Sequence, residues 1–249
     1  MTTGLLSPKE LFERAPLFPT DTVAQWGKTL VVAPHADDET LGCGGAIAAL
    51  CRRKLPVHIL MVSDGSMSHP RSEKFPAPIR IVIREKEARR ALKLLGADPE
   101  LSLFLRLPDT QVPFPGHVEF ASAVEAVRAY LERIQPDTIL LPWRRDPHCD
   151  HRASWEILRA ALTESRMKTL WQEYFIWTWA SVQAADLPRP EEGKLWRLSV
   201  EESLERKKKA IEAHVSQTTR MIDDDPEGFI LKPEVITHFT QPFEVYLHA

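Results

Sequence analysis

Short apolar runs alternate along the chain with segments whose apolar residues recur at helical spacing. Thr29–Ala33 and Val57–Val62 are rich in β-branched residues, which is the pattern of buried parallel strands. Gly42–Arg53 lies between them and predicts a helix, so the first unit is β-α-β. Five later runs also predict strands: Leu101–Leu107, Thr138–Trp143, Trp171–Trp179, Trp196–Val200 and Phe243–Leu247.

The segments between these strands predict further helices. Ile83–Leu95 carries charged residues on one side and apolar residues on the other, and Gly96 predicts where this helix ends. The other predicted helices are His117–Ile134, Arg152–Ser165 and Glu201–His214. This alternation indicates an α/β protein with a Rossmann-like, doubly wound fold, in which a mostly parallel sheet is flanked by helices on both faces.

We expect residues 1–249 to form a single domain. The chain contains no internal repeat and no low-complexity segment. Two segments lack a helix or strand pattern and are expected to be loops. Ser66–Pro78 is rich in proline and serine and is a candidate lid, whereas Ala184–Lys194 is a loop rather than a domain linker.

Composition narrows the classes of function. The formal charge is −3 and the pI is near 6.3, so there is no basic footprint for nucleic acid or an anionic membrane. Cys43, Cys51 and Cys149 are too few and too scattered for a disulfide framework. The N-terminal residues show no signal-peptide pattern, and the run Ala46–Cys51 is too short to cross a bilayer. We therefore expect a cytoplasmic protein without a transmembrane segment, acting on a small molecule and compatible with homo-oligomer formation.

The first predicted strand runs directly into a group of ionisable residues. Within VVAPHADDETLGCGG (Val31–Gly45), four such residues follow the strand: His35, Asp37, Asp38 and Glu39. Burying these charges without a partner is costly, and a divalent metal ion would supply a partner. If a helix begins after Pro34, His35 and Asp38 share one face, while Asp37 points about 100° away. The segment therefore predicts two metal ligands beside one free carboxylate.

A second ionisable cluster, DPHCDHR at Asp146–Arg152, follows the apolar run Thr138–Trp143. Its two histidines, His148 and His151, are three residues apart and can also face one direction. Imidazole and carboxylate ligands suit zinc, and three protein ligands with one open position are typical of a catalytic zinc site. The candidate ligands are the histidine and second aspartate of the first cluster and one of these two histidines. The spacing leaves open which of the two it is.

These two clusters resemble the PIG-L/LmbE-like family of N-acetylglucosaminide deacetylases. The family has a PHxDDE-type box and an HxDH box, which match PHADDE from Pro34 and HCDH from His148. Three weaker matches follow in the family's order: REKEARRALKLLG (Arg84–Gly96), the LPD turn (Leu107–Asp109) and KKKAIEAHVSQ (Lys207–Gln217). The resemblance covers roughly residues 29 to 217. Ala36 and Cys149 stand where proline is common in the family, but neither position would carry a ligand.

The resemblance also implies a metal and a reaction. By position in the motifs, zinc would be bound by His35, Asp38 and His151. The same ligands accept Fe²⁺ or another divalent ion, because selectivity often follows availability. The implied reaction is hydrolysis of the acetamide of an N-acetylglucosamine-type conjugate, which releases acetate and a free amine.

Three other residues of the boxes receive catalytic roles from the resemblance. Asp37 would act as general base, taking the proton of the metal-bound water and then returning it to the departing amine. His148, in its protonated form, would share the developing oxyanion with the metal. Asp150 would orient His148.

Substrate binding is implied at three positions outside the boxes. Arg84 would grip substrate hydroxyl or phosphate groups, Asp109 would support the sugar or the site, and His214 would line it. Two of them also have structural interpretations. Arg84 would then pair with Glu85 or Glu87 on a solvated helix, and His214 would pack between helices.

Other functions are compatible with parts of this pattern. The glycines of Gly42–Gly45 suggest a nucleotide-binding Rossmann-like module, but a dinucleotide fingerprint needs its glycines directly after the strand, where acidic residues here would repel phosphate. A zinc hydrolase of another amide or sugar conjugate would use the same site. A non-catalytic zinc protein would coordinate its metal fully with protein ligands. The sequence does not identify the aglycone.

Overall fold

One sheet of eight strands organises the molecule. The computed structural model describes residues 7–181 and 183–248. Its strands are β1 (Leu17–Phe18), β2 (Thr29–Ala33), β3 (Val57–Ser63), β4 (Ser102–Leu107), β5 (Thr138–Pro142), β6 (Leu170–Tyr174), β7 (Lys194–Ser199) and β8 (Phe243–His248). They lie in the order β1-β7-β8-β6-β5-β2-β3-β4. Strands β2 to β6 pair in parallel, whereas β8 is antiparallel to both of its neighbours.

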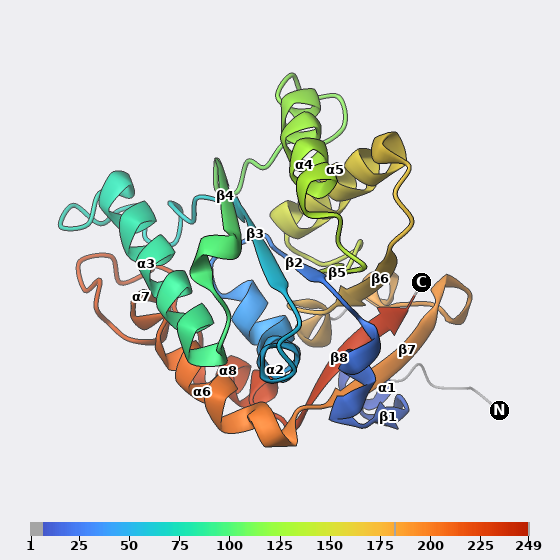
Figure 1. Cartoon of the computed structure of the whole chain (residues 1–249). Helices are drawn as coiled ribbons and strands as arrows, with labels where there is room; N and C mark the ends of the chain where they lie inside the picture. The colour runs from blue at the N-terminus through green and yellow to red at the C-terminus, as the bar shows by residue number, and fades with distance from the viewer. Residues whose placement is uncertain (1–6, 182, 249) are drawn as a thin grey trace.

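Helices cover both faces of this sheet. They are α1 (Pro8–Arg14), α2 (Asp38–Arg52), α3 (Ala77–Leu95), α4 (Phe120–Ile134), α5 (Cys149–Ser165), α6 (Leu204–Glu212), α7 (Val215–Thr218) and α8 (Pro233–Phe239). Helices α4 and α5 lie on one face, and α2, α3 and α6 lie on the other (Figure 1). Each face has its own apolar core, because alternate residues of the buried strands point to opposite sides. The predicted Rossmann-like α/β fold is confirmed.

Most predicted elements appear in place, although several begin or end a few residues away from the prediction, and two of these differences have identifiable reasons. Helix α3 begins at Ala77, so Pro78 lies in its first turn, where proline is tolerated. It ends at Leu95, and the next residue, Gly96, has a φ of 91° and forms the left-handed cap typical of a glycine. The strand predicted over Trp171–Trp179 stops at Tyr174. Beyond it, the backbone N–H of Trp177 donates to the Asp146 carboxylate instead of to a neighbouring strand.

The glycines of α2 allow this helix to pack closely against its neighbours. A Cβ atom on Gly42 would lie 2.4 Å from the Tyr174 ring, and one on Gly45 would lie 2.4 Å from Val200. Both glycines lie inside the helix rather than in the turn that follows β2. The nucleotide-binding interpretation of this segment is therefore wrong, because a phosphate loop needs its glycines in that turn.

A buried ion pair joins α2, α6 and β8. Lys207 and Glu244 are each almost fully buried, and the Lys207 ammonium donates to the Glu244 carboxylate at 2.7 Å. The same carboxylate accepts hydrogen bonds from the backbone N–H groups of Gly45 and Ala46, at 2.6 and 2.9 Å, and from the Tyr246 hydroxyl at 2.9 Å. Glu244 thus connects the last strand to the middle of α2.

The loop predicted at Ser66–Pro78 is fastened to a second loop near the C-terminus. Asp224 accepts hydrogen bonds from the Ser72 hydroxyl at 2.7 Å and from the backbone N–H groups of Glu73 and Lys74, at 2.9 and 2.8 Å. The Lys74 ammonium pairs with Asp223 at 2.8 Å. Whether this loop acts as a lid stays a prediction. Among the described residues, none of the helices has the length and apolar composition needed to span a membrane.

The strand order brings the two ionisable clusters together. β2 is followed by α2 and β3 on one side, whereas β5 pairs with the other side of β2 after a crossover through α4. The direction of winding therefore reverses between β2 and β5. Open α/β sheets bind ligands at such a point, outside the carboxyl ends of the strands. The PHADDE segment leaves β2 and the HCDH segment leaves β5 at this edge.

Candidate active site

The first box folds as a turn followed by a helix. His35 precedes α2 instead of lying within it, and Asp38 is the first residue of the helix. The turn closes because the backbone N–H of His35 donates to the Asp38 carboxylate at 2.9 Å. His35 and Asp38 therefore meet as predicted, but a turn brings them together rather than helical spacing. In the second box, His148 caps α5 and His151 lies in its first turn.

Two histidines from different strand ends converge on one carboxylate oxygen. His35 Nδ1 and His151 Nε2 each lie 3.2 Å from Asp38 Oδ2. A tetrahedral zinc ion with bonds of about 2.0–2.1 Å holds its ligand atoms about 3.3 Å apart. Both nitrogens of His151 are buried without a well-formed hydrogen bond in the structure, as expected of a ring placed for a metal. The chemistry of these three side chains and their two distances to Asp38 Oδ2 suit a divalent metal ion.

Carboxylates lie behind both rings. The other nitrogen of His35, Nε2, is 3.1 Å from Asp150 and 3.3 Å from Asp109. The other nitrogen of His151, Nδ1, is 3.4 Å from Asp146. Metal-binding histidines commonly donate their second N–H to a carboxylate, which fixes the tautomer and the ring orientation. Each ring thus has one nitrogen beside Asp38 Oδ2 and the other nitrogen beside a supporting carboxylate.

The electrostatics of the cluster favour an added positive charge. Burial alone would lower the pKa of His151, but Asp38 and Asp146 outweigh it and raise that pKa to about 9. Burial alone would raise the pKa of Asp38, yet His151 and His35 hold it well below its usual range. A divalent cation would take the place of the ring protons, because metal ligands bind in their deprotonated forms.

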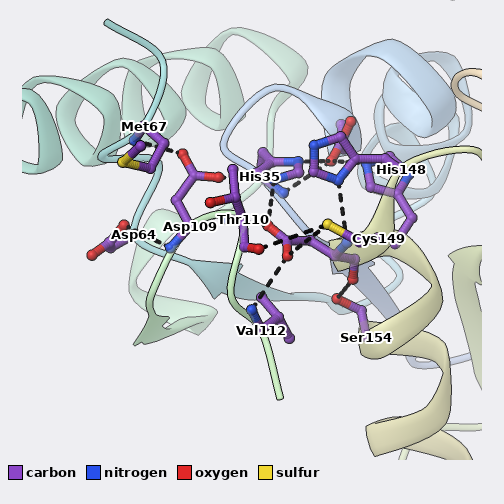
Figure 2. Close-up of polar contacts among 12 residues, drawn as sticks. His35, Asp64, Met67, Asp109, Thr110, Val112, His148, Cys149 and Ser154 are labelled. Carbon is purple, nitrogen blue, oxygen red and sulfur yellow. Dashed lines mark hydrogen bonds and ion pairs between the residues drawn. The ribbon is translucent and has the colours of Figure 1, made fainter. Parts of the chain in front are cut away.

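Three other groups of candidate ligands have donor atoms within 4.8 Å of one another: His35, His148 and His151; His148, Cys149 and Asp150; and His35, Asp109 and Asp150. The group of three histidines shares two rings with the set above. Figure 2 shows His35 beside His148, and their ring centroids are 4.6 Å apart. His148 Nδ1 is occupied, because it accepts the backbone N–H of Asp150 at 3.2 Å. His148 can therefore offer only Nε2 to a metal or to a substrate.

The bond at Nδ1 also determines how His148 can act. A ring nitrogen that accepts a hydrogen bond carries no proton, so the proton of a neutral ring is assigned to Nε2. Burial, reinforced by His35 and His151, lowers the pKa of His148 to about 4. This lowered pKa disfavours the protonated His148 expected from the sequence. The Asp150 carboxylate, expected to orient His148, lies at the His35 ring and accepts the Thr110 N–H.

Asp37 is held in an unusual backbone conformation next to the metal cluster. Its φ of 151° and ψ of −25° are rarely adopted by a residue with a side chain, and such strain occurs mainly at functional sites. The buried Glu39 carboxylate holds this conformation by accepting the Asp37 N–H at 3.0 Å. Burial raises the pKa of Asp37 to about 6, although Arg84, 3.3 Å away, acts in the opposite direction.

Arg84 is a buried part of this site. Its guanidinium donates to the Ala36 carbonyl at 2.7 Å in addition to pairing with Asp37. The alternative in which Arg84 pairs with Glu85 or Glu87 on a solvated helix is therefore wrong. Glu85 pairs with Arg106, whereas Glu87 is buried against α7.

A cavity of about 230 Å³ opens over the cluster. Its polar lining includes residues from both boxes and from two of the predicted substrate-binding positions: His35, Asp37, Asp38, Arg84, Asp109 and His148. Its apolar lining includes Leu41, Met67, Trp177, Phe229 and Leu231. His214, the third predicted substrate-binding residue, is absent from the lining. It is buried, with Nε2 3.5 Å from Glu39 and 3.3 Å from the Thr40 hydroxyl.

Sequence reasoning missed two supporting carboxylates. Asp146 begins the second cluster and accepts the backbone N–H groups of His148 and Trp177, at 3.0 and 2.9 Å, while facing His151. Glu39 ends the first box and supports Asp37. The sequence did contain a signal for both residues, because both lie within the ionisable clusters. Their contacts depend on turns that motif spacing does not describe.

The fold and this cluster define a hydrolase with a metal centre at the carboxyl edge of an α/β sheet. Residues 30–162, just over half of the chain, match the family described as PIG-L: GlcNAc-PI de-N-acetylase. The chain belongs to this PIG-L family of deacetylases, which are metal-dependent amide hydrolases. The resemblance found in the sequence is confirmed.

Individual proteins agree with this assignment. The chain is 26% identical over 195 residues to the protein described as probable N-acetyl-alpha-D-glucosaminyl L-malate deacetylase 2 of Bacillus anthracis, covering 76% of this chain and 80% of that protein. The fold is similar to N,N'-diacetylchitobiose deacetylase from Pyrococcus horikoshii, with a TM-score of 0.67, 21% identity and coverage of 95% and 89%. It is also similar to the zinc-inhibited form of teicoplanin deacetylase Orf2, with a TM-score of 0.62, 18% identity and coverage of 88% and 97%.

Proposed function

We propose that this protein is a zinc-dependent N-deacetylase that hydrolyses the acetamide of an N-acetylglucosamine-type conjugate. The observation that carries the proposal is the meeting of His35 and His151 at the Asp38 carboxylate, with Asp37 alongside as a second, separate carboxylate. His35, Asp38 and His151 would hold the ion. This set is favoured over the three histidines because Asp38 contributes negative charge and lies 3.2 Å from both other ligands.

The residues around the ion divide the chemistry between them. A divalent ion held here would lower the pKa of a water molecule to about 7 and polarise the amide carbonyl. Asp37 lines the cavity and would take the proton of the attacking water, then return it to the amide nitrogen as the C–N bond breaks. His148 would donate its Nε2–H to the carbonyl oxygen as negative charge develops there. Acetate and a free amine are the products.

Other residues would hold the reacting groups in place. Glu39 would position Asp37 through its backbone N–H, and His214 would support Glu39 from behind. Asp150 would hold the ring of His35. Arg84 would restrain Asp37 and present its remaining donor capacity to the substrate.

The cavity supports a substrate with a small reacting unit. A volume of about 230 Å³ is below the range of about 300–1,000 Å³ typical of drug-sized ligands, so a single sugar unit fits better than a large aglycone. Met67 and Phe229 are each about 40% exposed and lie at this cavity. An aglycone would therefore extend past apolar side chains. The similar protein from Bacillus anthracis is described as a probable N-acetyl-alpha-D-glucosaminyl L-malate deacetylase, so a malate conjugate belongs in the substrate panel.

Acetate release is the direct test of this function. Purified protein, with its bound metal quantified, is incubated with N-acetylglucosamine conjugates carrying malate, inositol, a second sugar or a short lipid, with and without a chelator. We expect acetate release that the chelator abolishes and one equivalent of zinc restores. Excess zinc needs a separate arm, because Orf2 was crystallised in a zinc-inhibited form. Fe²⁺ serves as the competing metal.

Four variants test how the roles are divided. Asp37→Asn is expected to keep the metal and to lower kcat about 10²- to 10⁴-fold. His151→Ala is expected to lose the metal, whereas His148→Ala is expected to keep it and react more slowly. Metal loss in His148→Ala with metal retained in Asp38→Ala would favour the three-histidine set instead.

The remaining outcomes separate this proposal from its alternatives. One bound metal per chain without acetate from any conjugate would indicate a hydrolase of another amide or sugar conjugate. A protein that neither contains metal nor takes up zinc would contradict the proposed metal centre.

A further inference from the structure

Gln217 is a buried residue of the cavity wall that the mechanism above does not use. It lies in α7, is fully buried and lines the same cavity as Arg84 and His35. Its backbone is fixed from both sides. The Gln217 N–H donates to the His214 carbonyl at 2.9 Å, and its carbonyl accepts the Leu231 N–H at 2.7 Å. The position of the side chain is therefore determined by the fold around it.

A chain of hydrogen bonds determines which end of the Gln217 amide points toward Ser216. The Glu87 carboxylate accepts both the backbone N–H of Ser216, at 2.7 Å, and its hydroxyl, at 2.6 Å. The only hydroxyl hydrogen of Ser216 is thereby used, so its oxygen can only accept. It accepts from Gln217 Nε2 at 3.0 Å. This assigns the nitrogen to Ser216 and leaves the carbonyl oxygen, Oε1, on the other side.

Gln217 Oε1 has no hydrogen-bond partner among the residues that the structure describes, although it is buried. A buried acceptor without a partner is costly and rare, so a missing partner is expected. Arg84 Nε, a donor from the same cavity wall, is likewise buried without a partner. A hydroxyl group can donate to an amide oxygen and accept from a guanidinium, so hydroxyl chemistry suits both orphaned groups.

We propose that Gln217 is a substrate-binding residue whose side-chain oxygen accepts a hydrogen bond from a hydroxyl group of the amino sugar. Glu87 and Ser216 are positioning residues, because they aim the amide without reaching the cavity. This inference rests on the proposed deacetylase function. It adds a specificity contact, since an analogue that lacks the hydroxyl would leave Oε1 unpaired.

The test combines a side-chain change with changes in the substrate. The best N-acetylglucosamine conjugate from the acetate assay is compared with its 3-, 4- and 6-deoxy analogues. Gln217→Met keeps a similar length and removes the acceptor. We expect KM for the parent conjugate to rise about 5- to 10-fold, with kcat changed less than twofold and the metal content unchanged.

The deoxy analogues distinguish recognition from a structural effect. For wild type, kcat/KM is expected to be about 5- to 10-fold lower with one of the deoxy analogues than with the parent conjugate. For Gln217→Met, kcat/KM with that analogue should equal its kcat/KM with the parent conjugate, whereas the other two analogues should lower kcat/KM by the same factor as in wild type. Equal losses in wild type and variant on every analogue, or an unchanged KM for the parent, would overturn the inference. If Gln217→Met does not fold, Ser216→Ala is used in its place. This change removes the hydrogen-bond partner of Gln217 Nε2, so the amide is no longer held in position. The decrease in kcat/KM with that one analogue should then be smaller than in wild type.

Failure of the underlying function gives a different result. Wild type that releases no acetate from any conjugate contradicts the deacetylase proposal and this inference with it. Wild type that is active and shows the same analogue profile as both variants contradicts the role of Gln217 alone.

Discussion

Removal of the Lys207 ammonium should destabilise the protein strongly, although Lys207 lies outside the metal cluster. In Lys207→Met, Glu244 would remain almost fully buried without its cation. Breaking a buried pair from one side costs about 3–5 kcal/mol. Three other donors still reach Glu244, from Gly45, Ala46 and Tyr246, so the lower end of that range applies. We expect a loss of about 3 kcal/mol.

Neutralising the partner in the same chain should restore part of this stability. Glu244→Gln in the Lys207→Met background removes the uncompensated charge and keeps one acceptor oxygen. The double variant is expected to lie only about 1–2 kcal/mol below wild type, which corresponds to a hydrogen bond or two. Glu244→Gln alone should cost about as much as Lys207→Met, so the two changes are far from additive.

Denaturant unfolding followed by tryptophan fluorescence measures these differences, and thermal unfolding checks them. For a chain of this size, about 3 kcal/mol corresponds to a fall in Tm of about 6–12 °C. Lys208→Met is the matched control, because Lys208 follows on the same helix and pairs with Glu205 at the surface. That change should cost less than about 1 kcal/mol. Equal losses for Lys207→Met and Lys208→Met, or additive losses in the double variant, would refute the reasoning.

Three further changes probe other parts of the fold and site. Gly45→Ala should destabilise by about 1–3 kcal/mol, because its Cβ would lie 2.4 Å from Val200; unchanged stability in urea would contradict the close packing of α2. Asp146→Asn should weaken metal affinity about 10- to 100-fold by loosening His151, measured by competition with a chromophoric chelator, and an unchanged affinity would remove its supporting role. Burial lowers the pKa of His238 to about 4, so its stabilising contribution is complete above about pH 6.5 and is lost as pH falls toward 4. His238→Phe should flatten that part of the stability profile, and an identical slope in both proteins would argue against it.

The alternation of strand and helix patterns along the chain was sufficient to predict the architecture. β2 coincides with the predicted Thr29–Ala33, because a β-branched run between polar turns leaves few alternatives to a buried strand. The motifs predicted which side chains converge, since strand ends at one edge of a parallel sheet must meet. Roles inside the cluster were harder to predict. The partner of Asp150 depends on a hydrogen bond from Thr110 in the turn after β4, and the position of the proton on His148 depends on a hydrogen bond from the Asp150 N–H at the start of α5.

Long-range polar contacts had no signal in the sequence. Nothing local indicates that Glu244 serves the middle of α2, because such a contact joins residues 199 positions apart. The backbone conformation of Asp37 could not be predicted from the sequence either. A φ of 151° at an aspartate contradicts its local conformational preference, and only the surrounding contacts hold the residue there. His214 was assigned to the cavity from its motif, yet it lies behind Glu39, one layer further from the substrate.

The placement of β8 has a consequence for how the protein is made. A ribosome synthesises α2 long before it synthesises Glu244. The hydrogen bonds from the middle of α2 to Glu244 can therefore form only after β8 has been made. Until then, β6 and β7 each lack their antiparallel partner, and Lys207 has no counter-charge. Exposed strand edges of this kind invite pairing with other chains. A nascent chain stalled before residue 243 should therefore depend on chaperones, and one that is released early should be a substrate for proteolysis.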